Sequence, residues 1–139
     1  MATWKLFLIV APVFMLVDLI YLGVIMKNFY SHELGDLARR NGASLSPRWG
    51  AAIAVYLLIP GGIVLFVRPL LGDQATLLHA FGWGALFGLV TYGIYDLTNL
   101  ATLEKWTLRL SLADMAWGGV LSGTISIFML YIDRLLTRS

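Results

Sequence analysis

Three aspartates lie within long apolar runs of this sequence, where an acidic side chain could act as a general acid, a general base or a cation ligand. Asp18, Asp96 and Asp114 have no lysine or arginine beside them inside these runs. An ionised carboxylate at the centre of a bilayer costs about 2.5–3.5 kcal/mol. Each aspartate must therefore be protonated, be paired with a cation from the end of a run, or hold a bound cation or cationic substrate. The sequence leaves these alternatives open, and the cations at the ends of the runs are Lys27, Arg48, Lys105 and Arg109.

The spacing of small and polar residues predicts that two of the aspartates converge. Helical spacing puts one face of the third apolar run together from Gly84, Gly88, Tyr92, Asp96 and Asn99. A matching face in the fourth run consists of Asp114, Gly118 and Ser122. Because small faces allow two membrane helices to approach closely, we expect Asp96, Asn99 and Asp114 to share one pocket. Its lining would come from Tyr92, Tyr95 and Trp117.

The same pattern also fits a purely structural interpretation. Polar residues near the ends of membrane helices often hydrogen-bond to neighbouring helices, and glycine pairs four residues apart are common where helices only pack. Three buried acids without internal counter-ions exceed what packing usually requires, which favours a ligand-handling or catalytic site.

Four apolar stretches must position these residues. A hydrocarbon core of about 30 Å needs roughly 20 residues per helix, and the stretches that qualify cover about residues 4–26, 50–68, 77–101 and 110–132. We therefore predict an all-α integral membrane four-helix bundle that forms a single transmembrane domain over residues 1–139. In the 27–49 connection, near-helical spacing fits a short interfacial helix, although an ordinary polar loop is the alternative; the spaced residues are Phe29, Tyr30, Leu34 and Leu37.

Four spans divide the connections between two sides of the membrane. Both chain ends and the 69–76 connection share one side, called side A, and the 27–49 and 102–109 connections share the other, called side B. Side B holds six of the ten basic residues and side A holds four, a weak bias that favours side B in the cytoplasm. All three aspartates fall toward the side B ends of their spans, so the predicted pocket lies near that face.

Composition agrees with a membrane protein and excludes several chemistries. Hydrophobic residues make up 59% of the chain and charged residues 13%, against about 25% charged in soluble domains. The net charge of +2 is too small to indicate a nucleic-acid partner. With no cysteine, the chain can form no disulfide, thiolate metal site or cysteine nucleophile. The first apolar run is long for a signal peptide, so we expect it to be a retained anchor.

Four segments together resemble a bacterial family of small four-span membrane proteins, catalogued as domain of unknown function 2177. They are DLIYLG in the first span, NFY after it, YGIYDLTNLATLEKW leaving the third and DMAWG entering the fourth. The resemblance covers nearly the whole chain and implies a protein of the bacterial inner membrane, but it brings no established activity. The matched positions are Asp18, Gly23, Phe29, Tyr30, Tyr95, Asp96, Thr98, Asn99, Ala101, Thr102, Trp106, Asp114, Trp117 and Gly118. The chain departs from the family at Tyr21, where tryptophan is expected.

The sequence thus predicts an intramembrane polar pocket near one face, which handles a lipid-like or other apolar ligand. The candidate catalytic residues are Asp18, Asp96 and Asp114. The candidate ligand-binding residues are Tyr21, Tyr92, Tyr95, Thr98, Asn99 and Trp117. In an enzyme, the acids would serve as general acid and base, or as ligands of Mg²⁺, Mn²⁺ or Ca²⁺. The alternatives are a small transporter, or an accessory subunit of a larger membrane complex. Membrane lipids are the expected partners, a homo-oligomer is a further expectation, and the sequence names no cofactor.

Overall fold

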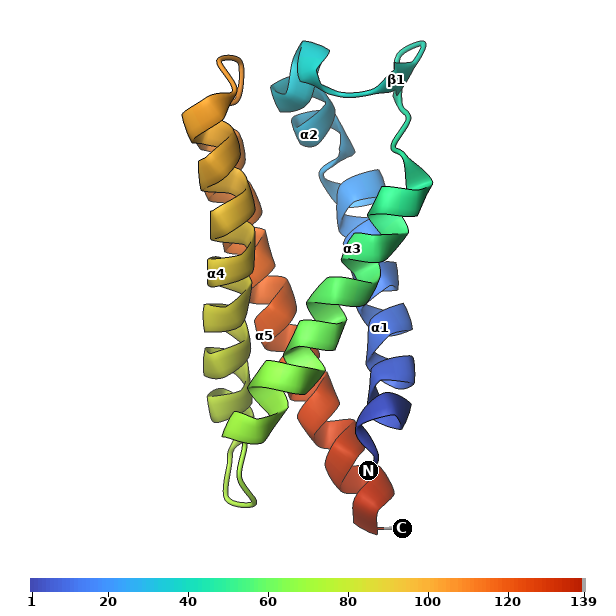
Figure 1. Cartoon of the computed structure of the whole chain (residues 1–139), viewed down its shortest axis with the longest axis vertical. Helices are drawn as coiled ribbons and strands as arrows, with labels where there is room; N and C mark the ends of the chain where they lie inside the picture. Colours follow the sequence, from blue (N-terminus) through green and yellow to red (C-terminus); the bar gives the residue numbers. More distant parts are fainter. Residues whose placement is uncertain (139) are drawn as a thin grey trace.

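The computed structural model describes residues 1–138, most of which belong to four long helices (Figure 1). The segments long and apolar enough to cross a membrane are Thr3–Ile25, Trp49–Leu70, Leu77–Thr102 and Leu108–Arg138. This arrangement confirms the predicted all-α membrane bundle. The last helix continues to Arg138, past the end predicted at about residue 132. The prediction ended where the apolar run ends, whereas the polar tail after it is also helical.

Two of the spans change helical type near one end. The first consists of α1 (Thr3–Ile20) and a π-helical segment, η1 (Tyr21–Ile25). The second consists of α3 (Trp49–Gly62), a π-helical segment η3 (Ile63–Val67) and a 3₁₀ turn η4 (Arg68–Leu70). A proline inside a helix removes one backbone donor, and η3 begins three residues after Pro60. The third and fourth spans are the α-helices α4 (Leu77–Thr102) and α5 (Leu108–Arg138).

The connection between the first two spans contains the short helix expected there. It runs through α2 (Lys27–Leu34), a 3₁₀ turn η2 (Gly35–Leu37) and two paired strands, β1 (Arg40–Asn41) and β2 (Ser44–Leu45). Gly35 adopts a φ of 51° and ends α2, so Leu37 lies beyond the helix. The Arg40 guanidinium donates to the backbone oxygens of Ser31 and Gly35 and thereby holds the connection together.

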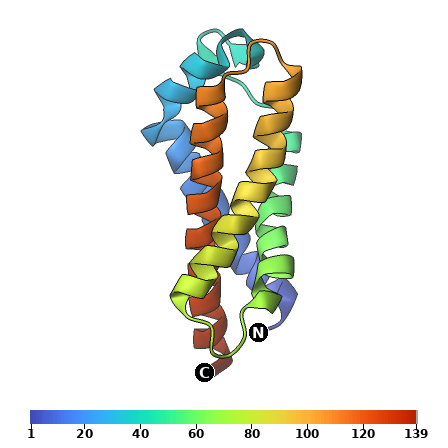
Figure 2. The same cartoon turned by 90° about the vertical axis from the view of Figure 1, so that its left-hand side faces the viewer.

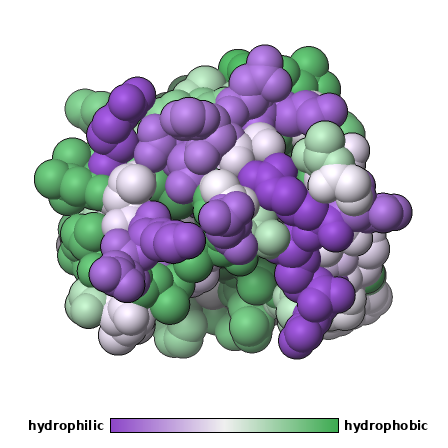
Figure 3. All heavy atoms as spheres, turned by 90° about the horizontal axis from the view of Figure 1, so that it is seen from above, coloured by the Kyte–Doolittle hydropathy of each residue, from purple (hydrophilic) through white to green (hydrophobic). Residues whose placement is uncertain are grey.

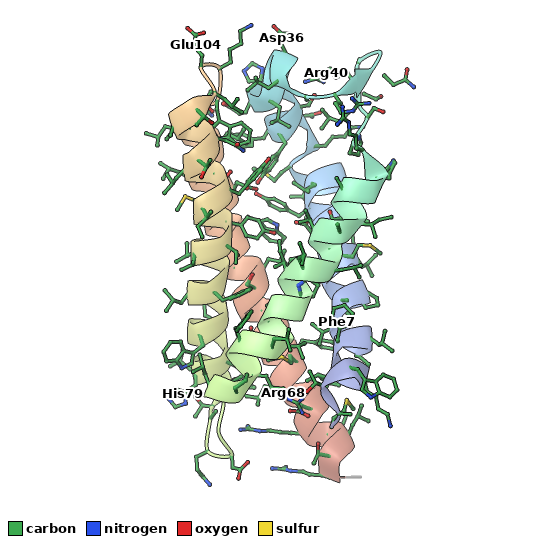
Figure 4. All side chains as sticks on the ribbon, viewed as in Figure 1. Phe7, Asp36, Arg40, Arg68, His79 and Glu104 are labelled. Atoms are coloured by element: carbon green, nitrogen blue, oxygen red, sulfur yellow. The ribbon has the colours of Figure 1, made fainter. Side chains whose placement is uncertain are left out.

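The two ends of the bundle carry different connections and separate ion pairs. Both chain ends and the η4–α4 connection lie on side A, while α2, β1 and the α4–α5 connection lie on side B, as predicted (Figure 1). Viewed from side B, hydrophilic side chains cover much of the end face and hydrophobic ones surround it (Figure 3). On side A, the Arg68 guanidinium pairs with the Asp133 carboxylate through bonds of 2.9 and 3.0 Å (Figure 4). This pair joins the second span to the fourth.

Glycines bring α4 and α5 into close contact, as their spacing predicts. A Cβ atom on Gly88 would overlap the backbone oxygen of Gly118, and a Cβ atom on Gly118 would overlap the ring of Tyr92. Gly84 abuts Ser126 in the same way. The two helices pack against each other, and α4 crosses in front of α5 toward side A (Figure 2). The predicted glycine faces therefore form the interface that carries Asp96.

The first two spans pack against this pair through an apolar core. Its fully or almost fully buried side chains are Leu6, Val10, Phe14, Ile63, Val64, Val67, Leu121, Ile125 and Met129. Between α1 and α3, a Cβ atom on Gly61 would lie 3.6 Å from the ring of Phe7, which is an ordinary contact (Figure 4). The core occupies the side A half of the bundle and leaves the polar side chains of the spans together nearer side B.

Candidate functional site

Asp96 lies on α4 at its interface with α5, and its side chain is completely buried. Neither of its carboxyl oxygens has a hydrogen-bond partner among residues 1–138. The carboxyl of Asp114 on α5 lies close enough to interact with the carboxyl of Asp96, although no hydrogen bond of ordinary length joins the two groups. The hydroxyl of Ser111 donates to the backbone oxygen of Asp96 at 3.1 Å and fixes the two helices in register. Since buried polar groups are nearly always paired in folded proteins, the Asp96 carboxyl needs an explanation.

Asp114 is partnered by a tyrosine from outside the membrane spans. The Tyr30 hydroxyl on α2 donates to Oδ1 of Asp114 at 3.0 Å. Burial and the nearby charge of Asp114 raise the pKa of Tyr30 well above its usual value, so this phenol remains a donor at neutral pH. The resemblance marked Tyr30 as a matched position, but the helical pattern of the spans gave no reason to place it at Asp114. This hydrogen bond ties α2 to the intramembrane acids.

Asp18 has a different environment, in which both carboxyl oxygens are satisfied. The Tyr56 hydroxyl donates to Oδ2 at 2.8 Å, and Nε1 of Trp117 donates to Oδ1 at 2.8 Å. Asp18 thus joins α1 to α3 and α5. Both oxygens of this buried acid therefore have hydrogen-bond partners, unlike those of Asp96.

Aromatic side chains connect the two acidic groups. The ring of Tyr21 stacks on Trp117, with centroids 3.8 Å apart and planes 10° from parallel. The hydroxyls of Tyr21 and Tyr30 lie 3.2 Å apart, within hydrogen-bonding distance. Tyr92 lies within electrostatic range of all three aspartates, Asp18, Asp96 and Asp114. The structure therefore brings the three predicted acids into one cluster with Tyr21, Tyr92 and Trp117.

No cation from the ends of the spans reaches these acids in the described part of the chain. Lys105 pairs with Asp36 at 3.4 Å, and Arg109 pairs with Glu33 at 3.8 Å. The ion pairs of residues 1–138 include none of the three aspartates of the spans. Among the described residues, no direct ion pair thus joins a rim cation to these acids, and Lys105 and Arg109 bind other acids near side B.

A comparison with known protein families identifies the family of this chain. Residues 3–131 match a family described as a predicted membrane protein, DUF2177. The chain belongs to the DUF2177 family. No curated protein and no solved structure matches it.

Not every predicted site residue of this DUF2177 protein lies in the cluster. Thr98 is exposed and lines an apolar groove of about 570 Å³ on the outer face of α4. Each residue turns a helix by about 100°, so Thr98 lies on the opposite side of α4 from Asp96. Tyr95 is 56% exposed and meets the ring of Trp106 edge-on, and half-buried Asn99 interacts with Tyr95. The expectation that Thr98 shares the pocket is wrong, since helical rotation separates it from the acids.

Two residues of this DUF2177 protein were missed by pattern analysis. Tyr56 donates to Asp18, and Ser111 links Trp106 to α4 by accepting from the indole nitrogen at 2.9 Å. The only available signal for Tyr56 was a polar hydroxyl in an otherwise apolar span. Among the described residues, no group of three or more metal-ligating histidine, aspartate or glutamate side chains occurs.

Proposed function

We propose that this protein of the bacterial inner membrane handles an apolar, lipid-like ligand at an intramembrane acid–base site. Asp96 and Asp114 are the acid–base pair, and together they hold one proton that is exchanged with the polar group of the ligand. Asp18 accepts hydrogen bonds from Trp117 and Tyr56 and positions these side chains beside the pair.

One observation carries this proposal: the completely buried Asp96 carboxyl with two unpartnered oxygens, next to Asp114. Leaving a buried polar group unpaired costs about 1–3 kcal/mol, and more for a charged one. A purely structural cluster would be expected to satisfy this group, as Asp18 is satisfied by Tyr56 and Trp117. Two carboxyls that approach one another favour sharing a proton, which gives a group able both to donate and to accept one.

The surroundings favour an apolar ligand. Tyr30 and α2 cover the side B end of the cluster, and the large side chains on the outer faces of α4 are hydrophobic. A ligand that reaches Asp96 from between the helices would therefore come from the hydrocarbon phase. Tyr92 and the stacked Tyr21 and Trp117 offer it aromatic surface and hydroxyl groups.

Asp96→Asn tests the proposal, because it keeps the size of the side chain and removes the exchangeable proton. The purified variant should unfold at the temperature of the wild type or slightly above it. Its infrared spectrum should lose the carbonyl band of a protonated carboxylic acid, and mass spectrometry should find less of any apolar molecule that copurifies with the wild type. Asp36→Asn is the matched control, since Asp36 is exposed and its ion pair within residues 1–138 is with Lys105. This variant should change neither signal.

A folded Asp96→Asn protein that keeps the infrared band and the same copurifying molecules would refute the acid–base site. An accessory subunit would give a different result again. Unrelated chains would then copurify in fixed proportion, and Asp96→Asn would leave that proportion unchanged.

A further inference from the structure

A second site lies at the opposite end of the molecule from the acids. A cavity of about 210 Å³ is found on side A, between the start of α4 and the last turns of α5. Its lining combines two arginines with large apolar side chains: Leu77, Leu130, Tyr131, Arg134, Leu135 and Arg138. Leu77, Tyr131 and Leu135 are each more than half exposed, so the cavity opens to the surroundings of the bundle.

Arg134 is held in place by the backbone of the η4–α4 connection. Its Nη2 atom donates to the backbone oxygens of Ala75 at 2.6 Å and Asp73 at 3.2 Å. This connection lies beside the last turns of α5 (Figure 2). A guanidinium has five N–H donors, so the donors on Nη1 and Nε stay available for another acceptor. The arginine is thus positioned before any ligand binds.

The positive charge of the cavity is not neutralised by acidic side chains of the described chain. The ion pairs within residues 1–138 include neither Arg134 nor Arg138. Asp133, the acid next to Arg134 in sequence, is occupied by Arg68. Arg138 follows Arg134 by one helical turn, which places both guanidinium groups on the same face of α5.

We propose that this cavity binds an anionic phospholipid, independently of the function proposed for the acids. The phosphate lies between Arg134 and Arg138, and an acyl chain follows the leucines that line the cavity. The position fits, because Leu77 begins the third span and Arg138 ends the fourth, and lipid headgroups lie at the ends of membrane spans. Clustered basic residues at this level attract anionic lipids, and an arginine fork matches phosphate oxygens.

The test compares lipids that differ only in headgroup charge. In native mass spectrometry, the wild type should retain phosphatidylglycerol in preference to phosphatidylcholine with the same acyl chains. Arg138→Gln should weaken retention about fivefold, the factor that corresponds to losing one basic residue near a charged surface. Arg134→Gln should weaken it at least as much. Arg39→Gln, an exposed substitution on side B, is the matched control and should have no effect.

Arg138→Gln is the decisive variant, because Arg134→Gln also removes bonds to the connection and can lower stability by itself. Equal retention of the two lipids, or unchanged retention by Arg138→Gln, would overturn the proposal. Inorganic phosphate at millimolar concentration should not displace the lipid. If it displaces the lipid or raises the thermal stability as much as the lipid does, the cavity is a phosphate-ion site and the lipid proposal fails.

Discussion

The α4–α5 interface allows a stability prediction that rests on one added methyl group. A Cβ atom on Gly88 would lie 2.7 Å from the carbonyl carbon of Gly118 and 2.7 Å from Oγ of Ser122, whereas ordinary contact begins at 3.4 Å. The backbone of α5 cannot rotate away as a side chain could, so the helices would have to separate by at least about 0.7 Å, and by more to clear the backbone oxygen of Gly118. A gap of that size forfeits about a quarter to a half of the dispersion attraction between facing atoms.

Gly88→Ala should therefore cost about 1–3 kcal/mol in packing, of which about 0.5–1 kcal/mol is offset by the better helix propensity of alanine. Gly82→Ala is the matched control on the same helix, because a Cβ atom there meets nothing within 4 Å. It should leave stability unchanged or raise it by about 0.5–1 kcal/mol.

Unfolding by sodium dodecyl sulfate in mixed micelles, followed by tryptophan fluorescence, measures both variants against the wild type. Gly88→Ala should be the less stable of the two by about 1–3 kcal/mol. If Gly88→Ala proves as stable as Gly82→Ala, the helices are not in the close contact described, and the register that brings Asp96 to Asp114 would also be wrong.

Two further predictions concern the tyrosines of the cluster. The raised pKa of Tyr30 means that its stabilising effect is present below about pH 10 and is lost as the pH rises further. Ultraviolet titration of the folded protein counts the tyrosines ionised by about pH 11, and Tyr30→Phe should leave this number unchanged. A decrease by one would contradict the burial of this phenol. Tyr56→Phe leaves Asp18 with one donor and should cost about 1.5–3 kcal/mol. The exposed Tyr131→Phe should change stability by less than about 0.5 kcal/mol in the same detergent titration, and equal effects of the two substitutions would show that the Asp18 bond contributes nothing.

Hydropathy and helical spacing were sufficient for the spans and for the α4–α5 face. Gly88 and Gly118 are small residues at regular helical spacing with polar neighbours, and this pattern specifies which face of each helix turns inward. Asp96 follows from the same face, so its burial could be predicted as well. The expectation failed at Thr98, although it belongs to the same segment, because sequence proximity does not place residues on one side of a helix.

The contacts to Asp18 could not be predicted, for a different physical reason. Tyr56 lies in a span that is apolar all around, so no periodic pattern shows which side of α3 faces its neighbours. Tyr30 reaches Asp114 only because α2 folds back over the side B end, and a connection of this kind leaves no periodic signal. The pairing of Lys105 with Asp36 and of Arg109 with Glu33 likewise depends on how α2 and η2 dock.

The π-helical segment Tyr21–Ile25 is a place where the first span can lose one residue without moving Tyr30. A π-helical turn contains about one residue more than an α-helical turn, and it is the structure that a single-residue insertion leaves in a regular helix. Deleting one residue here would convert the π-helical turn into an α-helical turn, and the residues before and after it would keep nearly the same orientation. Deleting one residue from the regular part of α1 would instead rotate everything that follows by about 100° and turn Tyr30 away from Asp114. A family member that lacks the extra residue of η1 would therefore retain the bundle, its buried acids and the Tyr30 donor.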